Sequence, residues 1–147
     1  MRSRTNRWWV GGVLLTALVG CTTSPQLAEV EGTVTLDGKP IEGVRVEFMP
    51  DPEAGHSGPN STGVTDAQGR FQLRCENQQN GAVIGKHRVT LTDLKQWEGL
   101  TTSREDANKP LKPSRIPAKY TDVVQTPFRG IEVKTSGNTI SLEVKTP

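Results

Sequence analysis

Residues 31–50 read Glu31-Gly-Thr-Val-Thr-Leu-Asp37-Gly38-Lys-Pro-Ile-Glu-Gly-Val-Arg-Val-Glu-Phe-Met-Pro50, and this stretch decides the fold class. On both sides of Asp37-Gly38, apolar residues alternate with polar ones. A period of two is typical of a strand with one buried face. The Asp-Gly pair favours a tight hairpin, because glycine adopts positive φ at no steric cost. The stretch therefore predicts two strands with a tight turn after the first.

The same alternation returns along the chain and predicts seven short strands in all. They are expected over residues 30–37, 44–49, 61–65, 71–75, 87–92, 131–133 and 140–144. Turn residues separate several of these segments, at 66–69, 80–81 and 136–138. Helical periodicity over ten residues is absent outside the first twenty residues. Strict alternation is typical of antiparallel sheets that are solvated on one side, so we expect an all-β, seven-stranded antiparallel β-sandwich.

The N-terminal twenty residues have the pattern of an export signal. Three arginines precede an uncharged run over residues 8–19, which is shorter than the roughly 20 residues that a bilayer-spanning helix needs. The following Leu18-Val19-Gly20-Cys21 resembles the lipobox of bacterial lipoproteins, in which the cysteine thiol receives a diacylglyceryl group. We expect a signal peptide over 1–20, lipid on Cys21, and anchoring to a bacterial membrane, at the outer membrane or cell surface. The alternative is a plain secreted protein with a chance cysteine after its signal.

The mature chain has a composition that excludes some classes of function. Removal of residues 1–20 takes away three arginines, which leaves fifteen Lys and Arg against sixteen Asp and Glu, a net charge of about −1. Nucleic-acid binding through a basic patch loses its support. Only Cys75 remains beside Cys21, so no internal disulfide forms once Cys21 carries lipid. We expect a polar tether over 21–28 and one domain over 29–147.

Two long segments interrupt the strand pattern, at residues 50–60 and 93–129. Connections this long inside a small domain are often functional. In the second, Ile116, Pro117, Lys119 and Tyr120 offer apolar, cationic and aromatic groups and are the candidate binding residues. For Ile116 and Tyr120 we favour the simpler interpretation that they pin the loop onto the sheets.

Several blocks of the sequence together resemble a known family. They are the stretch 31–50, then Ser61-x-Gly-x-Thr-Asp-x-x-Gly-x-Phe-x-Leu73, Gly85-x-His-x-Val-x-Leu91 and Ile116-Pro-x-Lys-Tyr120. The series is similar to the carboxypeptidase regulatory-like, or transthyretin-like (prealbumin-like), domain of many small bacterial lipoproteins. The resemblance covers about residues 30–145 and implies a seven-stranded sandwich with Greek-key connections. It implies no single activity, because the fold serves as accessory, carrier and binding module.

The residues present do not assemble a catalytic site of the enzymes that share this fold. His56 lacks a zinc-type His-x-x-Glu context, and Tyr120 is the only tyrosine, whereas intradiol dioxygenases need two. We interpret His56 as a solvated loop residue, His87 as a partly buried strand residue and Cys75 as a core residue. We therefore expect a non-catalytic interaction module that binds an envelope protein or glycan, with no metal, no cofactor and no nucleic acid. The alternatives are a hydrolase-like enzyme that uses His56 and His87, and a purely structural envelope protein.

Overall fold

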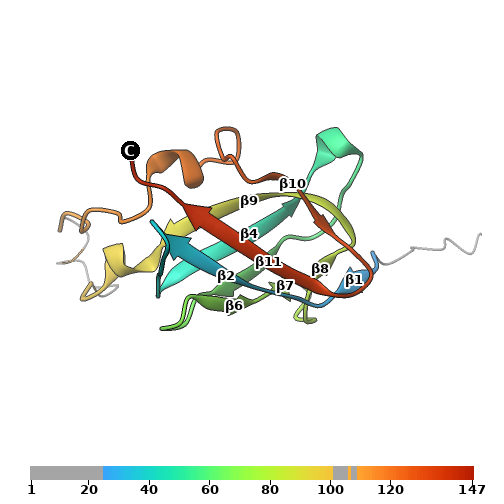
Figure 1. The fold of residues 1–147 in the computed structure, drawn as a ribbon, viewed down its shortest axis with the longest axis horizontal. Coiled ribbons are helices and arrows are strands. Elements are labelled where there is room, and N and C mark those ends of the chain that lie inside the picture. The colour runs from blue at the N-terminus through green and yellow to red at the C-terminus, as the bar shows by residue number, and fades with distance from the viewer. Residues whose placement is uncertain (1–24, 101–105, 107–108) are drawn as a thin grey trace, which may run out of the picture.

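Two facing β-sheets and a small two-stranded sheet make up the computed structural model, which describes residues 25–100, 106 and 109–147 (Figure 1). The described residues contain strands, turns and short 3₁₀ helices but no α-helix. The expected all-β sandwich is thereby confirmed. The expected signal peptide and Cys21 lie outside the described residues.

The larger sheet contains five strands, and chain neighbours are not always sheet neighbours. Its strands, in sheet order, are β10 (Arg129–Val133), β9 (Gly85–Asp93), β4 (Val44–Pro50), β5 (Ser61–Val64) and β7 (Arg74–Cys75). All of these pairs are antiparallel. The central pair, β4 and β9, sets Phe48 opposite Val89 and Val46 opposite Leu91, so their apolar faces point into the same core.

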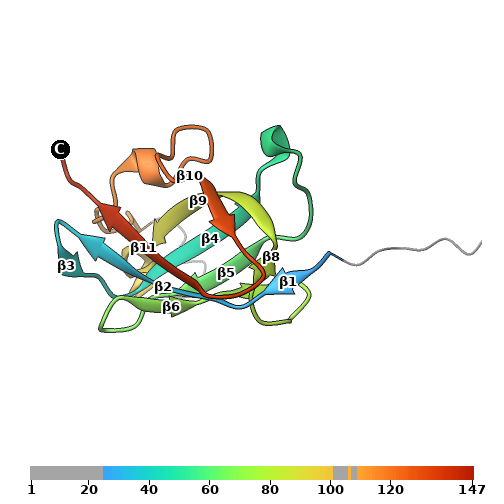
Figure 2. The same cartoon turned by 45° about the vertical axis from the view of Figure 1, so that its right-hand side comes forward.

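The second sheet is built around β2 (Val30–Leu36) (Figure 2). On one side of β2 lies β11 (Asn138–Val144), and on the other lie β3 (Lys39–Pro40) and β6 (Arg70–Gln72). The pairing of β11 with β2 is parallel, so the expectation of a purely antiparallel sandwich is wrong at this pair. Alternation predicts which face of a strand is buried, but it carries no information about the direction of the neighbouring strand.

The expected strand 71–75 is divided between the two sheets. β6 pairs with β2 in the smaller sheet, and β7 pairs with β5 in the larger one. The residue between them, Leu73, donates its N–H to Val30 O at 3.0 Å and accepts from Gly81 N–H at 2.8 Å. This crossing closes one side of the sandwich, because the same segment belongs to both layers.

The domain begins earlier than the expected tether over 21–28 allows. β1 (Leu27–Ala28) pairs with β8 (Ala82–Val83), and Ala28 is buried in the core. The pairing is extended by Ile84, whose N–H donates to Gln26 O at 2.9 Å. The sequence did not predict this strand, because two residues are too few to show a hydrophobic period.

The core has the composition that the alternation predicts. The inward side chains of the long strands are 0–1% exposed, and they include Val34, Val44, Val46, Phe48, Val89, Leu91, Leu142 and Val144. Phe71 packs against Phe48 with ring centroids 6.4 Å apart. It also lies over its cross-strand partner Gly32, where an added Cβ would come within 2.6 Å of the ring. An aromatic ring thus fills the space that the missing glycine side chain leaves.

The turn between β5 and β6 has the chemistry that its sequence predicts. The Asp66 carboxylate accepts hydrogen bonds from Gln68 N–H at 2.9 Å and Arg70 N–H at 2.8 Å. Gly69 has a φ of 71°, and a Cβ there would lie 2.6 Å from Val34 O. Asp66 is therefore a turn-forming residue. Position 69 favours glycine because its φ is positive and because a side chain there would clash with the Val34 carbonyl oxygen.

Candidate functional site

Several loops meet at the end of the sandwich opposite β1, and we call them the loop cluster (Figure 1). The loop cluster comprises residues 41–43, 65–69, 93–98 and 112–116. Thr65 ties two of its loops together, because its hydroxyl accepts from Val44 N–H at 2.9 Å and its carbonyl accepts from Gly43 N–H at 3.0 Å. Gly43 O in turn accepts from Leu94 N–H at 2.8 Å. The end of β9 and the hairpin before β4 are thus held as one unit.

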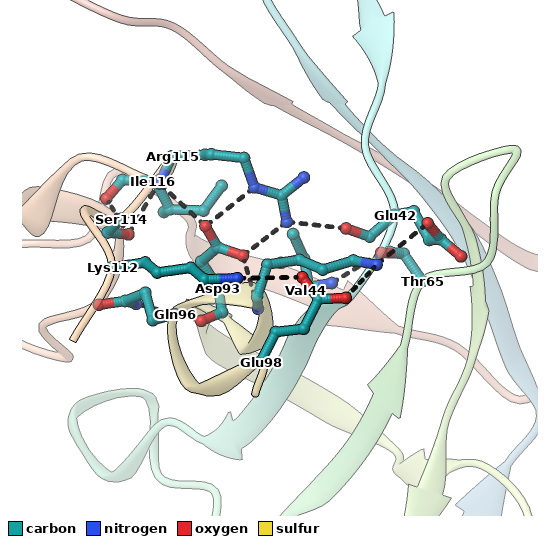
Figure 3. Close-up of polar contacts among 11 residues, drawn as sticks. Glu42, Val44, Thr65, Asp93, Gln96, Glu98, Lys112, Ser114, Arg115 and Ile116 are labelled. Atoms are coloured by element: carbon teal, nitrogen blue, oxygen red, sulfur yellow. Dashed lines mark hydrogen bonds and ion pairs between the residues drawn. The ribbon is translucent and has the colours of Figure 1, made fainter. Parts of the chain in front are cut away.

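Asp93 lies at the centre of this unit, fully buried at the last position of β9 (Figure 3). It caps the short 3₁₀ helix η2 (Leu94–Trp97), since its Oδ1 accepts from Lys95 N–H at 3.1 Å. Its Oδ2 accepts from both the backbone N–H and the Nε of Arg115, each at 2.9 Å. An Arg115 terminal nitrogen donates to Oδ1 at 2.5 Å. The guanidinium and carboxylate therefore form a bidentate pair.

The pair joins segments that are distant in the sequence. Arg115 also donates to Glu42 O at 2.9 Å, so it bridges the end of β9 and the hairpin before β4. Burial alone would raise the pKa of the Asp93 carboxyl, but the hydrogen bonds and the positive charge of Arg115 outweigh it and hold that pKa below its ordinary value. Asp93 raises the pKa of Arg115 in return. The pair is thus charged, and it holds the middle of the long segment 93–129 against the end of β9.

Exposed charged and apolar side chains surround this buried pair. Lys95 lies 3.5 Å from Glu42 and 3.9 Å from Glu98, and Lys112 lies 3.5 Å from Glu98. Such exposed pairs contribute little to stability. Trp97, at the end of η2, is 42% exposed, and Lys95 and Glu98 are close to it in the chain. A tryptophan in water on a backbone that a buried ion pair fixes is suited to contacting a partner.

The four candidate binding residues differ in burial: two belong to the core, one is half-buried and one is exposed. Ile116 and Tyr120 belong to the core, and the Tyr120 hydroxyl accepts from Lys145 N–H at 3.0 Å. The Tyr120 ring also lies 5.4 Å from the Phe128 ring, so both residues hold the long segment on the sandwich. Pro117 is half-buried and precedes the 3₁₀ helix η4 (Ala118–Tyr120), while exposed Lys119 lies 5.0 Å from the Tyr120 ring centroid. Of the four, Lys119 has the side chain most open to a partner.

The two histidines lie near each other but form no open site. His87 is 1% exposed; its Nδ1 lies 3.0 Å from Gly85 O, and its Nε2 is without a hydrogen-bond partner. Burial lowers the pKa of His87. Half-buried His56 packs against Gly85, where an added Cβ would come within 2.5 Å of its Nδ1. Gly85, with a φ of 136°, therefore leaves room for the His56 ring.

The two carboxylates close to His56 in the chain, Asp51 and Glu53, pair with Arg88 and not with a histidine. Arg88 lies 3.0 Å from Asp51 and 2.6 Å from Glu53, so both acids of the loop after β4 are engaged by one guanidinium. Across residues 25–100, 106 and 109–147, no three His, Cys, Asp or Glu side chains converge as ligands for a metal ion. Cys75 is buried with its sulfur as a free thiol.

Two shallow hollows lie along the smaller sheet, with volumes of about 490 and 700 Å³. They share Glu31, Gln72 and Thr139, and their linings extend to Arg70 and Arg74. The linings combine polar and apolar residues and contain neither histidine. The side chains that line these hollows include hydrogen-bonding groups of both charge signs.

The sequence did not predict the Asp93–Arg115 pair, although the alternation of β9 places Asp93 at an inward position. Asp93 continues the inward positions of His87, Val89 and Leu91, and an acid at a buried position needs a charged partner. Nothing in the sequence identifies Arg115 as that partner, because the two are 22 residues apart in the chain.

Comparison with known proteins assigns no activity. The sequence model of a family described as a domain of unknown function (DUF6795) matches residues 30–93. This range begins with β2 and ends at Asp93, so it includes the acid of the buried pair and stops before Arg115. No curated protein and no solved structure matches the chain.

Proposed function

We propose that this chain is an exported bacterial lipoprotein whose β-sandwich is a non-catalytic interaction module. The lipobox-like residues 18–21 support cleavage before Cys21 and lipid on its thiol. Stable anchoring needs two or more acyl chains, which a diacylglyceryl cysteine supplies. We place the mature chain at the outer membrane or cell surface, with an envelope protein or glycan as its partner.

The short distance between Cys21 and the first strand limits where the module works. From Cys21 to Leu27 a fully extended chain reaches at most about 20 Å. The pairing of β1 with β8 therefore keeps the sandwich beside the membrane that holds the lipid. None of the helices in the described part of the chain is long and apolar enough to cross a bilayer.

The loop cluster is the surface that we assign to the partner, and one observation carries this assignment. The buried Asp93–Arg115 pair fixes the backbone beneath Trp97, so that an exposed aromatic is presented without a large loss of loop entropy on binding. Tryptophan is enriched among the residues that dominate the binding energy of interfaces. The resemblance to carboxypeptidase regulatory-like and transthyretin-like domains agrees with a binding role and adds no activity.

The anchor is tested by fractionation of cells that express the full chain. Cys21→Ser should move the protein out of the detergent-soluble membrane fraction, or leave it as uncut precursor of higher mass. Cys75→Ser is the matched control, because Cys75 is buried in the sandwich and has no part in anchoring. A Cys21→Ser protein that stays in membranes at mature size would contradict the proposal.

The interaction surface is tested by photo-crosslinking in intact cells. A photoreactive residue in place of Trp97 should give a discrete adduct with an envelope protein or with glycan strands. The matched control is Val124, which is 65% exposed and lies outside the loop cluster. Equal adducts from both positions, or none from position 97, would remove the loop cluster as the binding surface.

A further inference from the structure

The two margins on the open side of the sandwich differ in how well they are protected. One margin is β10, which has a register irregularity between Arg129 and Ile131 with Gly130 at a φ of 68°. The other margin is β11, which pairs in unbroken register with β2 over seven residues (Figure 2). Bulges, prolines and charged side chains are the features that keep edge strands from pairing with other chains. β11 has neither a bulge nor a proline, and its single charged side chain is Glu143.

The direction of the backbone groups along β11 follows from two hydrogen bonds at its end. Val144 O accepts from Asp37 N–H at 2.9 Å, so Val144 turns its backbone groups toward β2. Lys145 N–H donates to the Tyr120 hydroxyl, on the opposite side. Successive residues of a strand direct their N–H and C=O to alternate edges. Ser141 and Glu143 therefore direct theirs away from β2.

These outward groups are available for a further strand. Within the described part of the chain, β2 is the only strand that pairs with β11. Thr139 shares the outward direction, but its N–H is taken by Gly137 O at 3.2 Å, which leaves its carbonyl. A row of backbone donors and acceptors at strand spacing is complementary to another extended polypeptide.

We propose that β11 pairs, antiparallel, with β11 of a second copy of this chain. Centred on Ser141, the pairing sets Ser141 opposite its own symmetry mate and Thr139 opposite Glu143 of the other copy. The two Ser141 residues exchange two backbone hydrogen bonds, and each Glu143 N–H donates to the opposite Thr139 carbonyl. The pairing is isologous, so every contact occurs twice.

Charge and local structure select this register over its neighbours. Centred on Glu143, the pairing would set two carboxylates directly opposite each other, which is destabilising. Centred on Thr139, it would need the Thr139 N–H that already binds Gly137. Around Ser141 no like charges meet, and on the inner face half-buried Ile140 lies opposite Leu142 of the other copy. The sequence of β11 is thus complementary to itself in one register.

Such an interface is small, so we expect anchoring to a shared membrane to increase the fraction of chains that are paired. Pairing of one strand buries less surface than a stable free dimer needs. Anchoring of both copies to one membrane raises their effective concentration without any new contact. The pairing itself does not depend on the lipid, and the unanchored chain should form the same dimer at high concentration.

Disulfide trapping tests the register in membranes that contain the full-length chain. Residues opposite each other in a hydrogen-bonded antiparallel pair have Cα atoms about 5.5 Å apart, within the range of a disulfide. Ser141→Cys should therefore give a covalent dimer after mild oxidation. Thr139→Cys is the matched control on the same exposed face, because its two copies would lie about 14 Å apart at strand spacing. We expect several-fold more dimer from Ser141→Cys.

A second variant separates pairing from folding. Glu143→Pro in the Ser141→Cys chain removes an outward N–H that β2 does not use, and should lower the trapped dimer to the level of Thr139→Cys while the far-UV spectrum is kept. Equal trapping from Ser141→Cys and Thr139→Cys would overturn the proposal. So would a Ser141→Cys adduct with a different protein in place of the dimer. The intact mass of the protein in the same sample shows whether Cys21 carries lipid, so the lipid proposal and the pairing proposal are tested separately.

Discussion

Replacement of Arg115 by alanine tests whether the buried ion pair holds the loop cluster together. The change removes two side-chain hydrogen bonds to Asp93 and one to Glu42 O. It leaves a carboxylate of zero exposure with only the backbone N–H groups of residues 95 and 115. Breaking a fully buried pair costs about 3–5 kcal/mol. Because the Arg115 side chain is 37% exposed, we expect a smaller loss of about 2–3 kcal/mol in the free energy of unfolding.

Urea unfolding of the Arg115→Ala, Asp93→Asn and double variants measures this loss as a thermodynamic cycle. The double variant should be more stable than the sum of the single losses predicts, since the neutral amide introduced by Asp93→Asn no longer leaves a buried charge unpaired. The pH dependence gives a second readout. The folded-state pKa of Asp93 lies below its unfolded value, so the contribution of the pair is present above about pH 4 and is lost as pH falls through the folded pKa. A loss below about 0.5 kcal/mol for Arg115→Ala, with no coupling in the cycle, would refute the reasoning.

Two further predictions concern the core. Phe71→Ala should lower the free energy of unfolding by about 3–5 kcal/mol, because it opens a cavity beside Phe48 and uncovers Gly32; a loss below about 1 kcal/mol in urea would mean that Phe71 does not fill the core. Burial lowers the folded-state pKa of His87, so the unfolded chain binds the proton more readily and stability should fall as pH drops below about 6.5. His87→Leu should flatten this fall between about pH 7 and 5, whereas His56→Gln, the matched control, should keep it; an unchanged slope in His87→Leu would assign the pH dependence to another group.

The strands were predictable because their patterns are local. The inward positions on β2, β4, β9 and β11 follow from a period of two, and each long strand lies where alternation placed it. The turn at Asp66 was predictable for the same reason, since its hydrogen bonds join residues two and four apart. Local chemistry is visible in a sequence even when the pairing of distant segments is not.

The features that the sequence did not predict depend on distant pairing. The parallel direction of β11 beside β2 joins the two ends of the domain, and no residue in either strand encodes it. The division of 71–75 between sheets depends on β2 and β5 competing for the same segment. The partner of Asp93 lies 22 residues away, across a segment without a period. By contrast, the core positions of Ile116 and Tyr120 agree with the interpretation that these two residues pin the long segment onto the sheets.

The intact mass of the native mature chain is the most direct test of whether lipid on Cys21 anchors this sandwich to a membrane. A chain that starts at Cys21 with a diacylglyceryl group, and with or without an N-terminal acyl chain, is the predicted result. Alkaline hydrolysis should then lower the mass by that of the ester-linked acyl chains and leave the glyceryl group on the sulfur. A mature chain that starts at Cys21 without lipid, or that starts at another residue, would contradict the claim that this sandwich is held at a membrane.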